Sequence, residues 1–312
     1  MILHRPASTP RAAIFALLLL LGSLWGLSFS LAKFGALGGI PPFGYAALLY
    51  CAVGLLLLAL AAWRRIRVPL DRATLRYALV GGLTSSGFPA VIMFSAVGHL
   101  PAGILAVIVA LAPLLTYALA LGLGGERFVV RRAVGTAIGL AGALLIVLPQ
   151  SSLPAPDLLP WVLFAMLTPV LYAGSNIYIA RARPAGADSV ALAALAQTVA
   201  GISMFAVAAA LGQAFLPGPP LDAAQIALAV HVLVGVVAQL LFFEITRVSG
   251  PVVLSQVGYV VTLTGLFWGW ALFGETHSAW VWLATAVILA GVVLVTWPAR
   301  GPARRPARPR SG

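Results

Sequence analysis

The sequence predicts an all-α membrane protein with ten transmembrane helices, arranged as two inverted five-helix repeats with both chain ends in the cytoplasm. Three observations support this fold class. First, 62% of the 312 residues are hydrophobic and only 8% are charged, whereas a soluble protein has about 25% charged residues. Second, one segment of the chain occurs twice in the same register. Third, the arginines lie in alternate connections between apolar segments, as the positive-inside rule requires.

Ten apolar segments are long enough to cross about 30 Å of hydrocarbon as helices. A helix satisfies its own backbone hydrogen bonds, which a segment surrounded by lipid must do. In chain order the expected spans are residues 12–36, 42–63, 77–97, 102–123, 133–148, 160–180, 189–211, 224–246, 252–272 and 279–297.

The distribution of positive charge predicts the orientation of these spans. With the N-terminus in the cytoplasm, every arginine falls at a chain end or in an inner connection, and the loop after the second span alone contains five. The outer connections contain neither arginine nor lysine; they are residues 37–41, 98–101, 150–159, 212–222 and 273–278. The one remaining cation is Lys33, near the outer end of the first span. This bias predicts an N-in, C-in topology.

Residues 93–149 and 242–298 align without a gap. The alignment places Gly125-Glu126 on Gly274-Glu275, an offset of 149 residues. Five spans per half is an odd number, so the second half enters the membrane from the opposite side. We therefore expect a cytoplasmic segment 1–11, a first repeat 12–149, an outer linker 150–159, a second repeat 160–298 and a disordered basic tail 299–312. An inverted duplication is typical of transporters.

Several other classes of protein fit the sequence poorly. The net charge of +12 comes from arginines in short connections, not from a nucleic-acid-binding face. Seven acids and four scattered histidines form no metal-binding or catalytic pattern. The single cysteine, Cys51, excludes an intramolecular disulfide, and there is no P-loop. We therefore expect no catalytic residue, no metal and no cofactor.

Short motifs in both halves carry a family resemblance. The run from Leu24 to Phe29 followed by Lys33, the pair Ala112-Pro113 and the Gly-Glu pairs resemble the EamA domain of the drug/metabolite transporter superfamily. The resemblance covers residues 12 to 298 and implies a ten-span plasma-membrane transporter, in a bacterial inner membrane. Such proteins commonly export amino acids, other metabolites or toxic organic compounds, and a few import. Thr262 replaces the proline expected opposite Pro113, which leaves the substrate class open.

Polar and aromatic side chains inside the spans are the candidates for a central substrate cavity, because polar groups are costly in lipid. They are Trp25, Ser28, Phe29, Lys33, Ser85, Tyr172, Asn176, Gln239, Gln256 and Tyr259. The alternative for the hydroxyls is hydrogen bonding between or within helices. Lys33 could hold a substrate carboxylate or extend to the outer interface. Neither His99 nor His231 is assigned a proton-relay role.

Four charged residues are candidates for a gate or a helix end: Glu126, Glu244, Arg247 and Glu275. Both Gly-Glu pairs would stop a helix and place a carboxylate near the N-terminus of the next one. The predicted partners are the lipid bilayer and a small-molecule substrate, with no nucleic acid. An exporter of small metabolites such as amino acids is the leading hypothesis. Efflux of drug-like compounds, a membrane-embedded enzyme and a structural protein are the alternatives; proton coupling, and monomer or homodimer, stay open.

Overall fold

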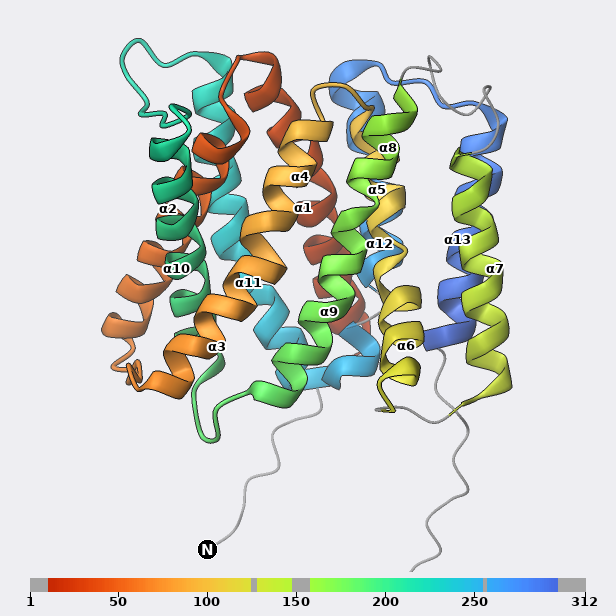
Figure 1. The fold of residues 1–312 in the computed structure, drawn as a ribbon, viewed down its shortest axis with the longest axis horizontal. Helices are drawn as coiled ribbons and strands as arrows, with labels where there is room; N and C mark the ends of the chain where they lie inside the picture. The colour runs from red at the N-terminus through yellow and green to blue at the C-terminus, as the bar shows by residue number, and fades with distance from the viewer. Residues whose placement is uncertain (1–10, 125–127, 148–157, 255–256, 297–312) are drawn as a thin grey trace, which may run out of the picture.

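The computed structural model describes residues 11–124, 128–147, 158–254 and 257–296, and every regular element in these ranges is a helix (Figure 1). The predicted all-α class is confirmed. In chain order the helices are α1 (Arg11–Leu37), α2 (Pro42–Trp63), α3 (Arg72–Gly82), the π-helical segment η1 (Leu83–Gly87), α4 (Phe88–Ala96), α5 (Ala102–Val109), α6 (Ala112–Gly122), α7 (Val130–Val147), α8 (Leu159–Ala165), α9 (Leu167–Ala182), α10 (Ser189–Ala210), α11 (Ala223–Leu254), α12 (Val257–Phe273) and α13 (Ala279–Thr296).

Seven helical segments of the described chain are long and apolar enough to cross a membrane. They are Ala12–Leu37, Pro42–Trp63, Arg72–Ala96, Ala102–Gly122, Leu159–Ala182, Ser189–Ala210 and Ala223–Phe242. Two shorter apolar helices, Val257–Phe273 and Ala279–Val295, match the predicted ninth and tenth spans. The predicted fifth span corresponds to α7, whose first turn contains Arg131 and Arg132. The protein is therefore a multi-spanning helical protein, and the number ten stays a prediction.

Three of the predicted spans are interrupted near a proline. Helix α5 ends at Val109, four residues before Pro113, and α8 ends at Ala165, four residues before Pro169. A proline ring clashes with the carbonyl four residues earlier and lacks the N–H that would bond to it. Residue Ser85, four before Pro89, lies inside η1. The sequence prediction treated each of these spans as one continuous helix.

Helix α11 differs from the prediction in the opposite direction. The sequence predicted a connection at residues 247–251, but α11 continues through Pro251 to Leu254. Proline is tolerated inside membrane helices when neighbouring groups satisfy the freed carbonyl. Residues Glu126 and Gln256, most of the predicted linker and the predicted basic tail lie outside the described residues.

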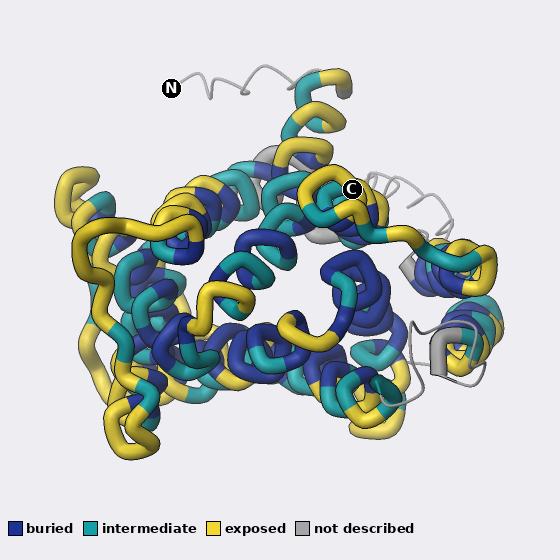
Figure 2. Tube along the Cα trace, turned by 90° about the horizontal axis from the view of Figure 1, so that it is seen from above, coloured by how far each residue is buried: buried dark blue, intermediate teal, exposed yellow. Residues whose placement is uncertain are grey.

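Close helix pairs hold the bundle together, and most buried positions lie on faces turned toward other helices (Figure 2). Helix α2 packs along α10, α7 along α13, and α1 along α11 and α12; α9 packs against α4 and α6. Glycines spaced four residues apart lie at close contacts: Gly22 and Gly26 face α12, Gly135 and Gly139 face α13 and α6, and Gly265 and Gly269 face α5 and the connection after α12.

The two ends of the bundle differ in charge. We call the end with connections 64–71 and 183–188 the arginine-rich end; the N-terminus of α1 lies there too (Figure 1). We call the end with connections 38–41, 97–101, 211–222 and 274–278 the arginine-free end. The described connections at the second end contain neither arginine nor lysine.

Candidate functional site

An ion pair at the arginine-free end joins two residues that the sequence had singled out separately. Lys33, near the end of α1, donates from Nζ to Glu275 Oε1 at 2.5 Å, and the two side chains are 17% and 6% exposed. Helix α12 ends at Phe273. Gly274 follows at φ +63°, a left-handed conformation that glycine adopts without strain because it has no Cβ. Its N–H bonds to Trp270 O at 2.9 Å, and the turn places Glu275 beside the helix.

The carboxylate of Glu275 also caps a helix. Oε1 accepts from the N–H of Ala102 at 2.8 Å and Oε2 from the N–H of Gly103 at 3.1 Å. Negative charge is favourable at a helix N-terminus, where N–H groups have no partner within the helix. The sequence predicted such a cap on the next helix, α13, but the capped helix is α5, from the other half of the chain. A side chain on Gly269 would overlap this carboxylate.

Two further residues complete this charged cluster, and sequence reasoning missed both. His277 Nε2 lies 3.9 Å from Glu275 Oε2; the His277 side chain is 3% exposed, and Nε2 has no hydrogen-bond partner. The Lys33 ammonium lies 4.7 Å from the centre of the Phe273 ring, a cation–π contact. Phe273 in turn packs against Phe34 of α1. The available signal was their position in the sequence, since each lies two residues from Glu275.

His277 should make stability depend on pH. Burial lowers the pKa of His277 from 6.5, Lys33 lowers it further, and Glu275 opposes both. The unfolded chain then binds the proton more readily, so stability falls as pH decreases through about 6.5. We expect the Tm in lipid nanodiscs to fall between about pH 7.5 and 5.5, with a smaller fall in His277→Gln. An equal pH dependence in the variant would contradict this assignment.

A second group of candidates lies halfway along the bundle, where η1 faces α9. Gly81, two residues before η1, packs against Ile179 of α9, and η1 itself contacts α9. Ser85 is partly exposed, and its Oγ lies 3.5 Å from Ser86 Oγ. A π-helical segment inside an α-helix often accompanies a functional site.

Helix α9 contributes the other polar groups at this depth. Asn176 is exposed and donates from Nδ2 to Thr116 Oγ1 of α6 at 3.2 Å. Tyr172 is partly exposed. The buried Ser175 Oγ has no partner. Tyr172 and Asn176 thus lie one turn apart on α9, and α9 contacts the η1 segment that contains Ser85.

The remaining cavity candidates lie in the bundle apart from these two groups. Ser28 donates to Leu24 O of its own helix at 3.1 Å, the local bond considered as its alternative role. Trp25 packs against Phe242 of α11, and Phe29 packs against the core. Gln239 on α11 and Tyr259 on α12 are partly buried, as is Glu244. Nothing is described for the side chain of Arg247.

A buried polar pair adds a contact that the sequence did not indicate. The Tyr45 hydroxyl of α2 lies 2.9 Å from His231 Nδ1 of α11, and Phe94 of α4 meets the Tyr45 ring edge-on. Both polar side chains are buried. His231 is thus a packed side chain, as expected, and joins α2 to α11.

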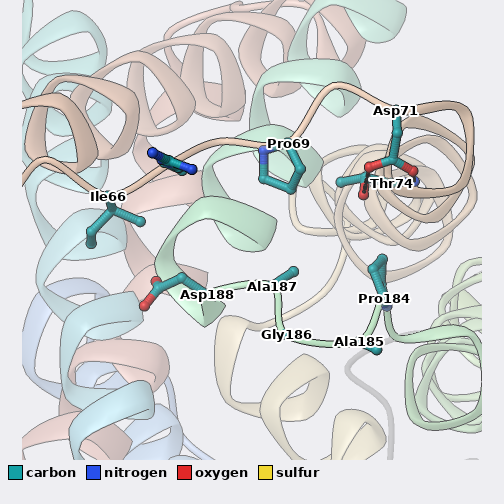
Figure 3. A pocket seen from close by; sticks show the side chains of 10 residues that line it. Ile66, Pro69, Asp71, Thr74, Pro184, Ala185, Gly186, Ala187 and Asp188 are labelled. Atoms are coloured by element: carbon teal, nitrogen blue, oxygen red, sulfur yellow. Dashed lines mark hydrogen bonds between the residues drawn. The ribbon is translucent and has the colours of Figure 1, made fainter.

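A hollow of about 340 Å³ lies at the arginine-rich end between connections 66–71 and 184–188 (Figure 3). Both acids in its wall cap helices. Asp71 Oδ1 accepts from the N–H groups of Ala73 and Thr74, and Asp188 accepts from the N–H of Val190. The hydroxyl of Thr74, hydrogen-bonded to Oδ2, lowers the pKa of Asp71. The described residues contain no cluster of metal-ligating side chains.

Comparison with known proteins finds relatives along nearly the whole chain. The sequence profile of the EamA-like transporter family matches twice, at residues 12–148 and 159–297. Escherichia coli K12 has a protein named "Uncharacterized inner membrane transporter YedA", which is 29% identical over 286 residues, or 91% of this chain and 90% of that protein. The protein of the same name in Escherichia coli O157:H7 matches equally.

Among solved structures, one described as "Crystal structure of protein" has a TM-score of 0.62. It is 21% identical in sequence, and the match covers 92% of this chain and 97% of that one. This similarity supports the overall fold.

Proposed function

The chain belongs to the EamA-like transporter family and is a multi-pass protein of the bacterial inner membrane, and from this premise we propose that it exports a small metabolite, such as an amino acid, by alternating access between two inverted halves. In that mechanism one set of contacts between the halves opens as its equivalent at the other end closes.

The strongest support is a set of contacts in which the repeat equivalents of two touching residues also touch each other. At the offset of 149 residues, Gly142 is equivalent to Gly291 and Gly139 is equivalent to Ile288. Gly142 packs against Ile288, and Gly291 packs against Gly139. If the two repeats are exchanged, α7 takes the place of α13 and α13 that of α7, so the contact between them is preserved.

The same relation holds between α2 and α10, which lie on the side of the bundle opposite α7 and α13 (Figure 1). There, at an offset of 147 residues, Gly54 is equivalent to Gly201 and Cys51 is equivalent to Thr198. Gly54 packs against Thr198, and Gly201 packs against Cys51. Likewise, the packing of α1 on α12 corresponds to that of α9 on α6. This internal symmetry supports inverted repeats, in which two related states have similar energies.

The charged cluster suggests which end is closed. The positive-inside rule assigns the arginine-rich end to the cytoplasm. The ion pair between Lys33 and Glu275 would then close the outer end.

The acids favour a neutral or zwitterionic substrate. In the described residues none of the seven candidate spans contains a carboxylate, and Glu244 lies near the inner end of the predicted span 224–246. A transporter of organic cations would need a carboxylate deep in the membrane. The aromatic side chains of Trp25, Phe29 and Tyr172 support efflux of drug-like compounds as the second candidate.

The test is uptake of radiolabelled amino acids by liposomes that contain the purified protein, with and without a pH gradient. We expect saturable uptake by the wild type and at least about a tenfold loss in an Asn176→Ala/Tyr259→Ala double variant. The pH gradient separates proton-coupled from facilitated transport.

The matched control is Val170→Ala/Leu263→Ala, two exposed apolar positions on the same helices, α9 and α12. It should transport like the wild type. Absence of uptake for every amino acid, with uptake of a lipophilic dye, would transfer support to drug efflux. Equal loss in the control would remove the assignment of Asn176 and Tyr259.

A further inference from the structure

Three donors converge on one carboxylate at the arginine-free end. They are the ammonium of Lys33 and the N–H groups of Ala102 and Gly103, at 2.5, 2.8 and 3.1 Å from Glu275 oxygens. A cation together with the first N–H groups of a helix is a complete receptor for an anion. Charge-assisted hydrogen bonds of this kind are about twice as strong as neutral ones.

The wall of this receptor contains a polar group that Glu275 leaves unused. The His277 side chain is 3% exposed, its Nε2 has no hydrogen-bond partner, and it lies 3.9 Å from Glu275 Oε2. A Cβ added to Gly103 would lie 2.8 Å from the same nitrogen. A buried polar atom without a partner is costly, so its presence beside the three donors indicates a ligand other than Glu275.

The candidate cavity residues of α1 lead toward this receptor. Trp25, Phe29 and Lys33 follow one another at a spacing of four residues and so share one side of the helix. All three are partly exposed. The stripe runs from the middle of α1 to the receptor.

We propose that Lys33 and the N-terminus of α5 bind the carboxylate of the transported solute, and that Glu275 occupies this site when no solute is present. The inference rests on the proposed transport function and narrows the substrate to solutes that carry a carboxylate. The carboxylate of the solute takes the place of the Glu275 carboxylate, so the Lys33 ammonium is never left buried without a counter-charge. Release of Glu275 also frees α1 from the connection after α12, so that binding favours opening of this end.

The first test examines the receptor without a transported solute. In lipid nanodiscs, sodium acetate should raise the Tm of Glu275→Ala more than sodium chloride of equal ionic strength, because acetate fills the vacant site. Acetamide should have no such effect, and Lys33→Met/Glu275→Ala should not respond to acetate. No acetate effect, or an equal effect on the double variant, would overturn the proposal.

The second test separates a substrate site from a purely structural cap. L-leucine and L-leucinamide differ only in the carboxylate, and their binding to nanodiscs can be compared by calorimetry. Leucine should bind about tenfold more tightly to Glu275→Gln than to the wild type, because the competing carboxylate is absent, and about tenfold more weakly to Lys33→Met. Leucinamide should be insensitive to both changes.

The two proposals fail in different ways. Equal transport and binding of leucine and leucinamide would reject the carboxylate site and leave the transporter proposal in place. Stabilisation of Glu275→Ala by acetate without uptake of any amino acid would reject amino acids as substrates while supporting the carboxylate receptor. Weaker binding of leucine to Glu275→Gln would show that Glu275 helps to hold the solute, which contradicts its proposed role as competitor.

Discussion

Glu275→Ala should open the arginine-free end of the protein to water. The change leaves the Lys33 ammonium without its counter-charge and two N–H groups of α5 without an acceptor. Breaking a buried ion pair by removing one partner typically costs about 3–5 kcal/mol. In a Cys51→Ala background, a Phe29→Cys side chain should therefore react at least about tenfold faster with a membrane-impermeant thiol reagent added outside intact cells.

Asp222→Ala is the matched control, because Asp222 is an acid at the same end whose carboxylate caps only its own helix, through the N–H of Gln225. It should leave the labelling rate unchanged. Lys33→Met should reproduce the faster labelling, since it breaks the same pair from the other side. Slow labelling in both Glu275→Ala and Lys33→Met would mean that other contacts keep this end closed.

Gly291→Leu should separate α7 from α13 and destabilise the fold. A Cβ at Gly291 would lie 2.6 Å from the carbonyl oxygen of Gly135 and 2.7 Å from Gly139 Cα. These neighbours are backbone atoms, so no side-chain movement can relieve the overlap. Overpacking costs about 3 kcal/mol in such a case, which corresponds to a fall in Tm of roughly 5–10 °C for a chain of this size.

The control for this change is Gly258→Leu on α12, where an added Cβ would meet nothing within 4 Å. Its Tm should stay close to that of the wild type. Both variants can be measured by fluorescence-detected thermal unfolding in detergent. A Tm for Gly291→Leu within about 2 °C of the control would show that the two helices are not in tight contact.

The sequence predicted the helices well because lipid imposes a simple rule on composition. Apolar runs of sufficient length had to be helical, as α2 and α10 are. It failed where a local feature changed the helix. Composition specifies neither the π-helical segment around Ser85 nor the continuation of α11 through Pro251.

The candidate residues were predictable singly but not as contacts. Lys33 and Glu275 each stood out as charges in an apolar chain, yet 242 residues separate them, and nothing in the sequence pairs them. The prediction that Glu275 caps α13 was also wrong, because the N–H groups that its carboxylate meets in space belong to α5. Asn176 likewise bonds to Thr116 of α6, 60 residues away in the chain, and no local pattern links the two residues.

The proline interruptions are unequal in the two halves, and this affects how the bundle can bend. Pro113 ends α5, but its equivalent is Thr262, whose hydroxyl bonds to Gly258 O within an unbroken α12. Bends near residues 110 and 166 would let the short helices on either side change their angle independently, since each interruption lacks one backbone hydrogen bond. Helix α12, with Glu275 just beyond its end, would instead move as one rigid helix.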